Sequence, residues 1–259
     1  FLQRAIHVEG YHRIDEDTRT LLLLEAADFK NFATLNIERN FFTFTQNASY
    51  LFRFYEELSG ERVDIGSLEY ADTYGDYEEH ITILQELYSR YKDLCEERKV
   101  LDPIFLPQHY RLNESYLKTL GEVELYALGY LTNFELKVLT SCAEIIPLSL
   151  LYSANQYNAK LTGKFEKIGI PVVENSVQRI NLQTLAVDDV RPDKEEINAT
   201  VESFSQSLLQ VGFIKQKVYA LIKEGMAPEK IVVVLPDESF ARHLRRFDTE
   251  GNFNFAMGI

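Results

Sequence analysis

The pattern of hydrophobic and polar positions divides the chain into a helical first part and a mixed remainder. Apolar residues recur at helical spacing over Thr20–Ala27, where Asp15 is placed to cap the helix, and again over Phe41–Leu58. Between Tyr77 and Cys95 they step by four and three residues alternately, which predicts a narrow seam on a long helix with a charged outer face. This seam favours packing inside the protein over an exposed coiled coil, because isolated two-stranded coils need a longer run of heptads.

After about residue 118 the pattern changes to short apolar runs separated by turn signals. Strands are predicted over 122–128, 143–151 and 177–182. A helix is expected to begin near Thr132, with Glu135 in a capping-box position. The acidic stretch 187–196 contains a proline and is predicted to link two lobes.

The C-terminal part alternates between helical and strand-like patterns. One apolar stripe runs over Val211–Leu221 and ends at Gly225. The β-branched run 231–235 predicts a strand buried on both faces, and 253–257 predicts another. Such alternation is typical of a parallel sheet with right-handed crossovers, so the expected fold class is α/β with a large N-terminal helical subdomain. The expected domains are 1–118, which is helical, 119–192, which is α/β, and 193–259, which starts a second lobe.

Composition narrows the class of protein. The 259 residues are 46% hydrophobic, which is enough for a sizeable core. Two cysteines, Cys95 and Cys142, are too few for a disulfide framework and lack metal-ligand spacing. No signal peptide and no apolar run of spanning length is present, so a cytoplasmic protein without a membrane partner is expected.

Charge is strongly negative and unevenly spread. The formal net charge is −13, which argues against a free-standing DNA-binding module, because phosphate contacts require a basic face. Residues 61–102 hold 12 acidic and 5 basic side chains, so much of the acid lies on the long helix. One hypothesis is therefore an interaction protein that binds a basic partner through the helix over 77–99.

A second hypothesis comes from a family resemblance in the C-terminal part. The segments Glu202–Ser207, Ile231–Glu238 with its Leu-Pro-Asp-Glu ending, and Asn254–Gly258 resemble the AddB-like subunits of bacterial helicase–nucleases, which are related to RecB and RecC. The resemblance implies superfamily 1 helicase-like lobes of the P-loop NTPase type and a role in DNA double-strand-break repair and recombination. It implies DNA and a helicase–nuclease partner subunit as partners. The apolar start without an initiator methionine favours a fragment of such a protein.

The same resemblance bears on nucleotide chemistry. Leu128, Gly129 and Tyr130 match the strand-and-turn that reads Asp-Gly-Phe in the family, where the acidic residue would lie beside the magnesium ion of a bound nucleotide. Leucine cannot ligate a cation, so ATP hydrolysis is not expected. No stretch fits the phosphate-binding loop, and Thr162-Gly-Lys164 lacks its first glycine and its final hydroxyl. No cofactor is expected in this chain, and the predicted role is a catalytically silent motor scaffold.

Two further expectations concern DNA contacts and catalysis. The resemblance makes basic residues of the helical part the candidates for DNA contact, namely Lys30, Arg39 and Arg53. Aromatic residues near Arg39 and Arg53 could stack on single-stranded bases, but core packing is the favoured interpretation, because apolar residues fall on nearly every face of 41–58. The five histidines are scattered, so no catalytic residue is assigned.

Overall fold

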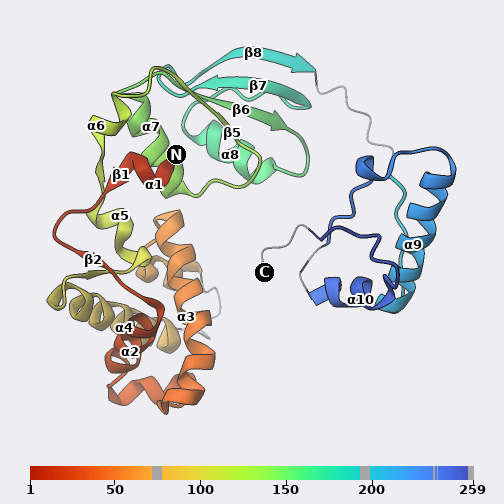
Figure 1. The fold of residues 1–259 in the computed structure, drawn as a ribbon. Coiled ribbons are helices and arrows are strands. Elements are labelled where there is room, and N and C mark those ends of the chain that lie inside the picture. Colours follow the sequence, from red (N-terminus) through yellow and green to blue (C-terminus); the bar gives the residue numbers. More distant parts are fainter. Residues whose placement is uncertain (72–77, 193–198, 236, 238, 256–259) are drawn as a thin grey trace. The chain divides into compact units, whose positions relative to one another are not determined.

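The computed structural model describes residues 1–71, 78–192, 199–235, 237 and 239–255, and the chain forms two compact units, Phe1–Lys194 and Glu195–Ile259 (Figure 1). The first unit contains, in chain order, α1 (Leu2–Ala5), β1 (Ile6–His7), β2 (His12–Arg13), α2 (Glu16–Ala26), η1 (Lys30–Leu35), α3 (Phe41–Glu61), η2 (Ile65–Ala71), α4 (Glu78–Glu97), β3 (Val100–Leu101), η3 (Pro103–Phe105), α5 (Leu106–His109), β4 (Arg111–Leu112), α6 (Glu114–Leu117), β5 (Val123–Tyr126), α7 (Asn133–Ala143), β6 (Leu148–Ala154), α8 (Ala159–Lys167), β7 (Ser176–Asn181) and β8 (Ala186–Pro192). The second contains α9 (Ser207–Lys223), η4 (Pro228–Lys230) and α10 (Ser239–Phe247). Among the described residues, no helix combines the length and apolar character needed to cross a membrane.

Helices α2, α3 and α4 surround the first hydrophobic core (Figure 1). The predicted cap of α2 is confirmed, because the Asp15 carboxylate accepts the backbone N–H of Thr18 at 2.9 Å. The seam of α4 packs into this core: Ile81, Tyr91 and Cys95 are buried, whereas Tyr77 lies outside the described residues. The predicted internal packing of the seam is therefore confirmed for its described part.

The aromatic residues of α3 divide between the core and the surface. Phe44, Phe52 and Tyr55 are buried, as the core interpretation predicted. Phe42 and Tyr50 are 80% and 74% exposed, so that interpretation is wrong for them. A helix of this length in a three-helix cluster buries one stripe, and residues outside that stripe remain at the surface even when they are aromatic.

A buried ionic network ties the helices of this core together. The Asp102 carboxylate is fully buried and accepts hydrogen bonds from Arg19 Nε at 2.6 Å, from the Tyr91 hydroxyl at 2.6 Å and from the Ile104 backbone N–H at 2.8 Å. The Arg19 guanidinium also bonds the Glu56 carboxylate and lies over the Phe52 ring, 3.9 Å from its centroid. Because every buried polar atom of this network has a partner, the network stabilises one packing of the helices.

The second core lies between a four-stranded sheet and the helices α7 and α8. Strand order is β5-β6-β7-β8, in which β5 and β6 are parallel while β6–β7 and β7–β8 are antiparallel. The mixed α/β class is confirmed, but the expected parallel sheet is wrong, because two of the three strand pairs are antiparallel. The second core also includes Ala5 and Leu117, which come from before residue 119.

The path of the chain after α8 explains the antiparallel pairing. Gly169 adopts φ +90°, and the following residues run back to the carboxyl end of β6, so that Ser176 at the start of β7 pairs with Ala154 at the end of β6. A helical crossover that returned to the other end of β6 would have given a parallel strand. A short turn then joins β7 to β8, and such a turn permits only an antiparallel hairpin.

The predicted boundaries in this region are right in part. The predicted strand over 177–182 is confirmed as β7, and the helix at Thr132 is confirmed as α7. Residues 143–151 do not form one strand, because α7 extends to Ala143 and β6 begins only at Leu148. The predicted linker 187–196 is wrong for 187–192, which pair with β7 as β8, and 193–196 lie outside the described residues.

In the second unit, α9 and α10 pack on each other, and the Gly225 C-cap is confirmed by its φ of +92°. No strand is present among the described residues of this unit. The predicted buried strand over 231–235 is wrong, because Val232 and Val234 are 79% and 86% exposed. A β-branched run forms a strand only when a neighbouring strand accepts its hydrogen bonds. The predicted strand 253–257 shows none in its described part, and Ala256 and Met257 lie outside the described residues.

Candidate nucleic-acid interface

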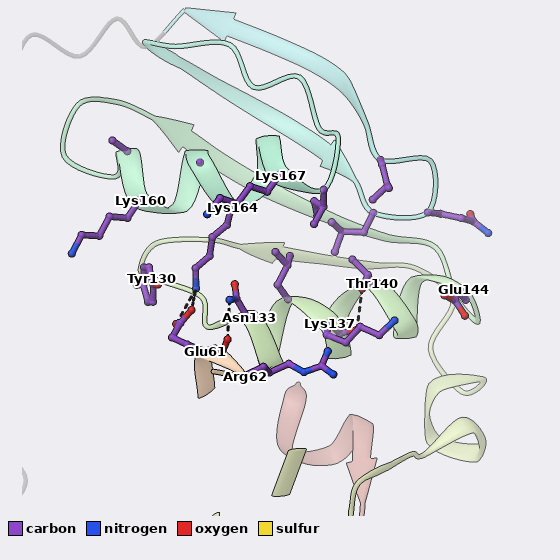
Figure 2. Close-up of a pocket in the computed structure, with 17 residues that line it drawn as sticks. Glu61, Arg62, Tyr130, Asn133, Lys137, Thr140, Glu144, Lys160, Lys164 and Lys167 are labelled. Atoms are coloured by element: carbon purple, nitrogen blue, oxygen red, sulfur yellow. Dashed lines mark hydrogen bonds and ion pairs between the residues drawn. The ribbon is translucent and has the colours of Figure 1, made fainter. Parts of the chain in front are cut away.

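An open groove of about 900 Å³ lies between α7 and α8 in the first unit, beside the C-terminal end of α3 (Figure 2). Five parts of the chain contribute to its wall: the end of α3, the β5–α7 connection, one face of α7, one face of α8 and the β7–β8 turn. The lining residues are Glu61, Arg62, Tyr130, Asn133, Leu136, Lys137, Thr140, Glu144, Ala159, Lys160, Gly163, Lys164, Lys167, Ile168, Leu182, Gln183 and Leu185.

Local sequence fixes how α7 borders the groove. Its N-terminus is held by a capping box, in which the Thr132 hydroxyl accepts the Glu135 N–H at 3.2 Å and the Glu135 carboxylate accepts the Thr132 N–H at 2.8 Å. Residues at helical spacing on one face of α7, including Lys137, line the groove. Leu139 and Cys142 lie on another face and are buried in the second core.

Helix α8 is amphipathic in the same sense. Lys160, Lys164 and Lys167 occur at positions i, i+4 and i+7 and form a basic row along the groove. Leu161 and Phe165 lie on the opposite face and are 2% and 0% exposed. Burial of those two side chains therefore determines which way the lysine row faces.

The groove is basic although the chain is acidic. Five basic and two acidic side chains line it, a net of +3, against −13 for the whole sequence. Arg62, Lys137, Lys160 and Lys167 are exposed, and no carboxylate of the described residues lies within ion-pair distance of them. Four unpaired cations around one concavity attract an anion, and their mutual repulsion makes an extended polyanion a better ligand than a single charge.

The fifth cation, Lys164, has a structural role. Its ammonium contacts both Glu61 carboxylate oxygens at 2.9 and 2.7 Å and the Leu131 carbonyl at 2.9 Å, so its three N–H donors are used (Figure 2). The Asn133 amide also donates to the Glu61 carbonyl at 3.0 Å. These bonds fasten the end of α3 to α7 and α8. Lys164 Nζ lies 4.1 Å from the centroid of the Tyr130 ring.

The structure separates the three residues that match the family's nucleotide-site turn. Leu128 is 92% exposed just after β5 and does not line the groove. Gly129 has no neighbouring atom within 4 Å of the position of a β-carbon. Tyr130 is 52% exposed and does line the groove. No carboxylate therefore occupies any of the three positions, and only the tyrosine is placed to contact a ligand.

The predicted DNA contacts lie elsewhere in the first unit, outside the groove lining. Arg39 Nη1 pairs with Asp28 at 2.6 Å, and Arg53 Nε pairs with Glu57 at 3.0 Å. Lys30 begins η1 and is exposed. Two of the three predicted cations are thus already neutralised by neighbours, whereas four of the five groove cations have no ion-pair partner among the described residues.

The groove cations were missed because they come from three separate segments, namely the end of α3, α7 and α8. The one available signal was the lysine spacing over 160–167, which the resemblance to an incomplete phosphate-binding loop obscured. Elsewhere in the described chain, no group of three or more His, Cys, Asp or Glu side chains could hold a metal ion. The two thiols are buried, and burial raises the pKa of Cys95 to about 12 and that of Cys142 to about 11, so neither is a reactive nucleophile.

Comparison of the chain with protein-family models, with curated proteins and with solved structures finds no match.

Proposed function

We propose that this chain is a catalytically silent, helicase-like scaffold of the AddB-like kind, which contacts DNA during double-strand-break processing in the cytoplasm and works with a helicase–nuclease partner subunit. The observation that carries the proposal is the basic groove on an acidic chain. The family resemblance supplies the biological setting, and the groove supplies a surface that can hold a phosphate backbone.

The charge distribution favours nucleic acid over a basic protein partner. Arg62, Lys137, Lys160 and Lys167 are exposed without carboxylate partners in the described chain, so they can neutralise phosphates without first breaking ion pairs. On α4, two of the six acidic residues, Glu86 and Glu96, pair with basic residues of the same helix, and the acidic face is a convex helix surface that contributes no residue to the groove. The groove in the first unit is therefore lined mainly by basic side chains that have no ion-pair partner among the described residues.

The silent character follows from the residues at the expected nucleotide site. A phosphoryl-transfer site requires an acidic metal ligand and backbone donors around the phosphates. By the family resemblance, Leu128 stands where that acidic ligand is expected, and its side chain is almost fully exposed and cannot bind a cation. DNA binding is therefore expected to be independent of ATP.

The test is fluorescence anisotropy of the 259-residue chain with a labelled single-stranded oligonucleotide, with and without ATP and magnesium. Four phosphate contacts predict a slope of about −3 for log K against log salt, and hence a loss of roughly 50-fold in affinity between 50 and 200 mM salt. ATP is expected to change nothing. Absence of binding at low salt, or binding insensitive to salt, would refute the proposal, and the acidic face of α4 would then become the candidate site for a basic partner.

A further inference from the structure

Tyr130 lies at one end of the groove with its ring orientation fixed from one side (Figure 2). The Lys164 ammonium lies 4.1 Å from the ring centroid, a cation–π contact. Because its three donors are held by Glu61 and the Leu131 carbonyl, Lys164 cannot turn away without breaking those bonds. The Lys164 side chain is only 11% exposed, so the contact is shielded from water.

The tyrosine nevertheless remains accessible. Its side chain is half-exposed, and no other aromatic ring of the described part of the chain stacks on it. An aromatic ring that is fixed on one side and open on the other is suited to stack on a nucleobase, since every base offers a π-face. Neither Leu128 nor Gly129 provides such a surface.

The basic row of α8 extends from the region of this ring. Lys160 and Lys167 are seven residues apart, which corresponds to about 10 Å along a helix. That length matches the rise of about three stacked nucleotides at about 3.4 Å each. A strand with one base on Tyr130 can therefore place phosphates beside Lys160 and Lys167, the two lysines of this row whose ammonium groups are exposed.

We propose that Tyr130 is a base-stacking residue that makes the groove selective for single-stranded over duplex nucleic acid. This inference rests on the proposed function, because it assumes that the groove binds nucleic acid. In a duplex the base faces are covered by neighbouring bases, so only the lysines and Arg62 would contribute. In a single strand the ring adds a contact that does not depend on base sequence. Lys164 is a positioning residue, since it contacts the ring and not the strand.

The experiment compares dissociation constants of the 259-residue protein and its variants for a single-stranded oligonucleotide and for a duplex with the same number of phosphates. Tyr130→Ala is expected to weaken single-strand binding by about fivefold or more, the usual loss for one stacked base, and to leave duplex binding unchanged. Tyr130→Phe keeps the ring and is expected to bind as the native protein does. Tyr157→Ala is the matched control, because Tyr157 is 88% exposed and does not line the groove.

The outcomes separate this inference from the proposed function. If the native protein binds neither oligonucleotide, the proposed function fails and the inference fails with it. If the native protein binds with strong salt dependence but Tyr130→Ala matches Tyr157→Ala on the single strand, stacking is refuted while groove binding stands. If Tyr130→Ala weakens single-strand and duplex binding equally, the residue supports the groove without selecting its ligand, and the inference is overturned. Tyr130→Phe distinguishes loss of the ring from loss of its hydroxyl in each case.

Discussion

Replacement of Asp102 by asparagine tests whether the buried ionic network stabilises the helical core. The carboxylate is fully buried and receives hydrogen bonds from Arg19, Tyr91 and the Ile104 N–H. Asparagine has nearly the same shape but only one acceptor oxygen. If that oxygen keeps the bond to the Ile104 N–H, the amide NH₂ faces Arg19 Nε, and two donors then oppose each other.

The size of the effect follows from the burial of the pair. Desolvation alone would lower the pKa of Arg19, but its bonds to Asp102 and Glu56 raise it above the ordinary arginine value, so the guanidinium is held charged in the core. Breaking a buried pair from one side costs about 3–5 kcal/mol. Because Arg19 retains a bond to the half-exposed Glu56 carboxylate, we expect a loss near the lower end, about 3 kcal/mol.

The assay is urea unfolding followed by circular dichroism, with a separate transition fitted for each unit if two appear. Glu57→Gln is the control, because it breaks the exposed pair between Arg53 and Glu57, whose side chains are 79% and 67% exposed. Exposed pairs of this kind contribute about 0–1 kcal/mol. If Asp102→Asn is as stable as the control, the buried ionic network does not stabilise the helical core.

Three further predictions concern stability and reactivity. Cys95 and Cys142, with exposed fractions of 1% and 0% and raised pKa values, are expected to resist a thiol reagent at pH 8 and to react in urea; rapid labelling of the folded protein would contradict their burial. The hydrogen bond from the Thr18 N–H lowers the pKa of Asp15, so the stabilisation by the Asp15 carboxylate is present above the pKa of the unfolded state and is lost as the pH falls through the pKa of the folded state. Asparagine at position 15 keeps the cap but does not titrate, so the stability of Asp15→Asn relative to the native protein is expected to increase when the pH is lowered from 5 to 3. Urea titrations at the two pH values measure this difference, and a constant difference would refute the prediction. Val232→Thr is expected to change the free energy of unfolding by less than about 0.5 kcal/mol, because Val232 is exposed. A loss above about 1 kcal/mol would indicate that Val232 is buried, as in the predicted strand.

Local features of the fold could be predicted from sequence where the deciding interaction is also local. The Asp15 cap, the Thr132 capping box and the Gly225 C-cap each involve residues within a few positions of one another. Strand direction could not be predicted in this way. It depends on where the chain travels after Gly169, and no periodicity in the sequence records that path.

The candidate site shows the same division. The position of Tyr130 after a strand could be read from the sequence, and it does line the groove. The cations beside it could not be assembled, since Arg62 ends a helix of the first core whereas Lys137, Lys160 and Lys167 belong to α7 and α8. Net charge was misleading for a related reason: an acidic total conceals a basic concavity when the acidic residues lie on another helix.

The most direct test of the central claim is the salt dependence of single-strand binding by the native protein and by the double variant Lys160→Gln/Lys167→Gln. Both lysines are exposed and lack carboxylate partners in the described chain, so their neutralisation would remove two of the proposed phosphate contacts without leaving a buried charge. We expect the slope of log K against log salt to become less steep by about 1.4 and the affinity to fall. The matched variant Lys30→Gln/Arg53→Gln is expected to keep the native slope. An unchanged slope in the Lys160/Lys167 variant would contradict the groove as the nucleic-acid interface.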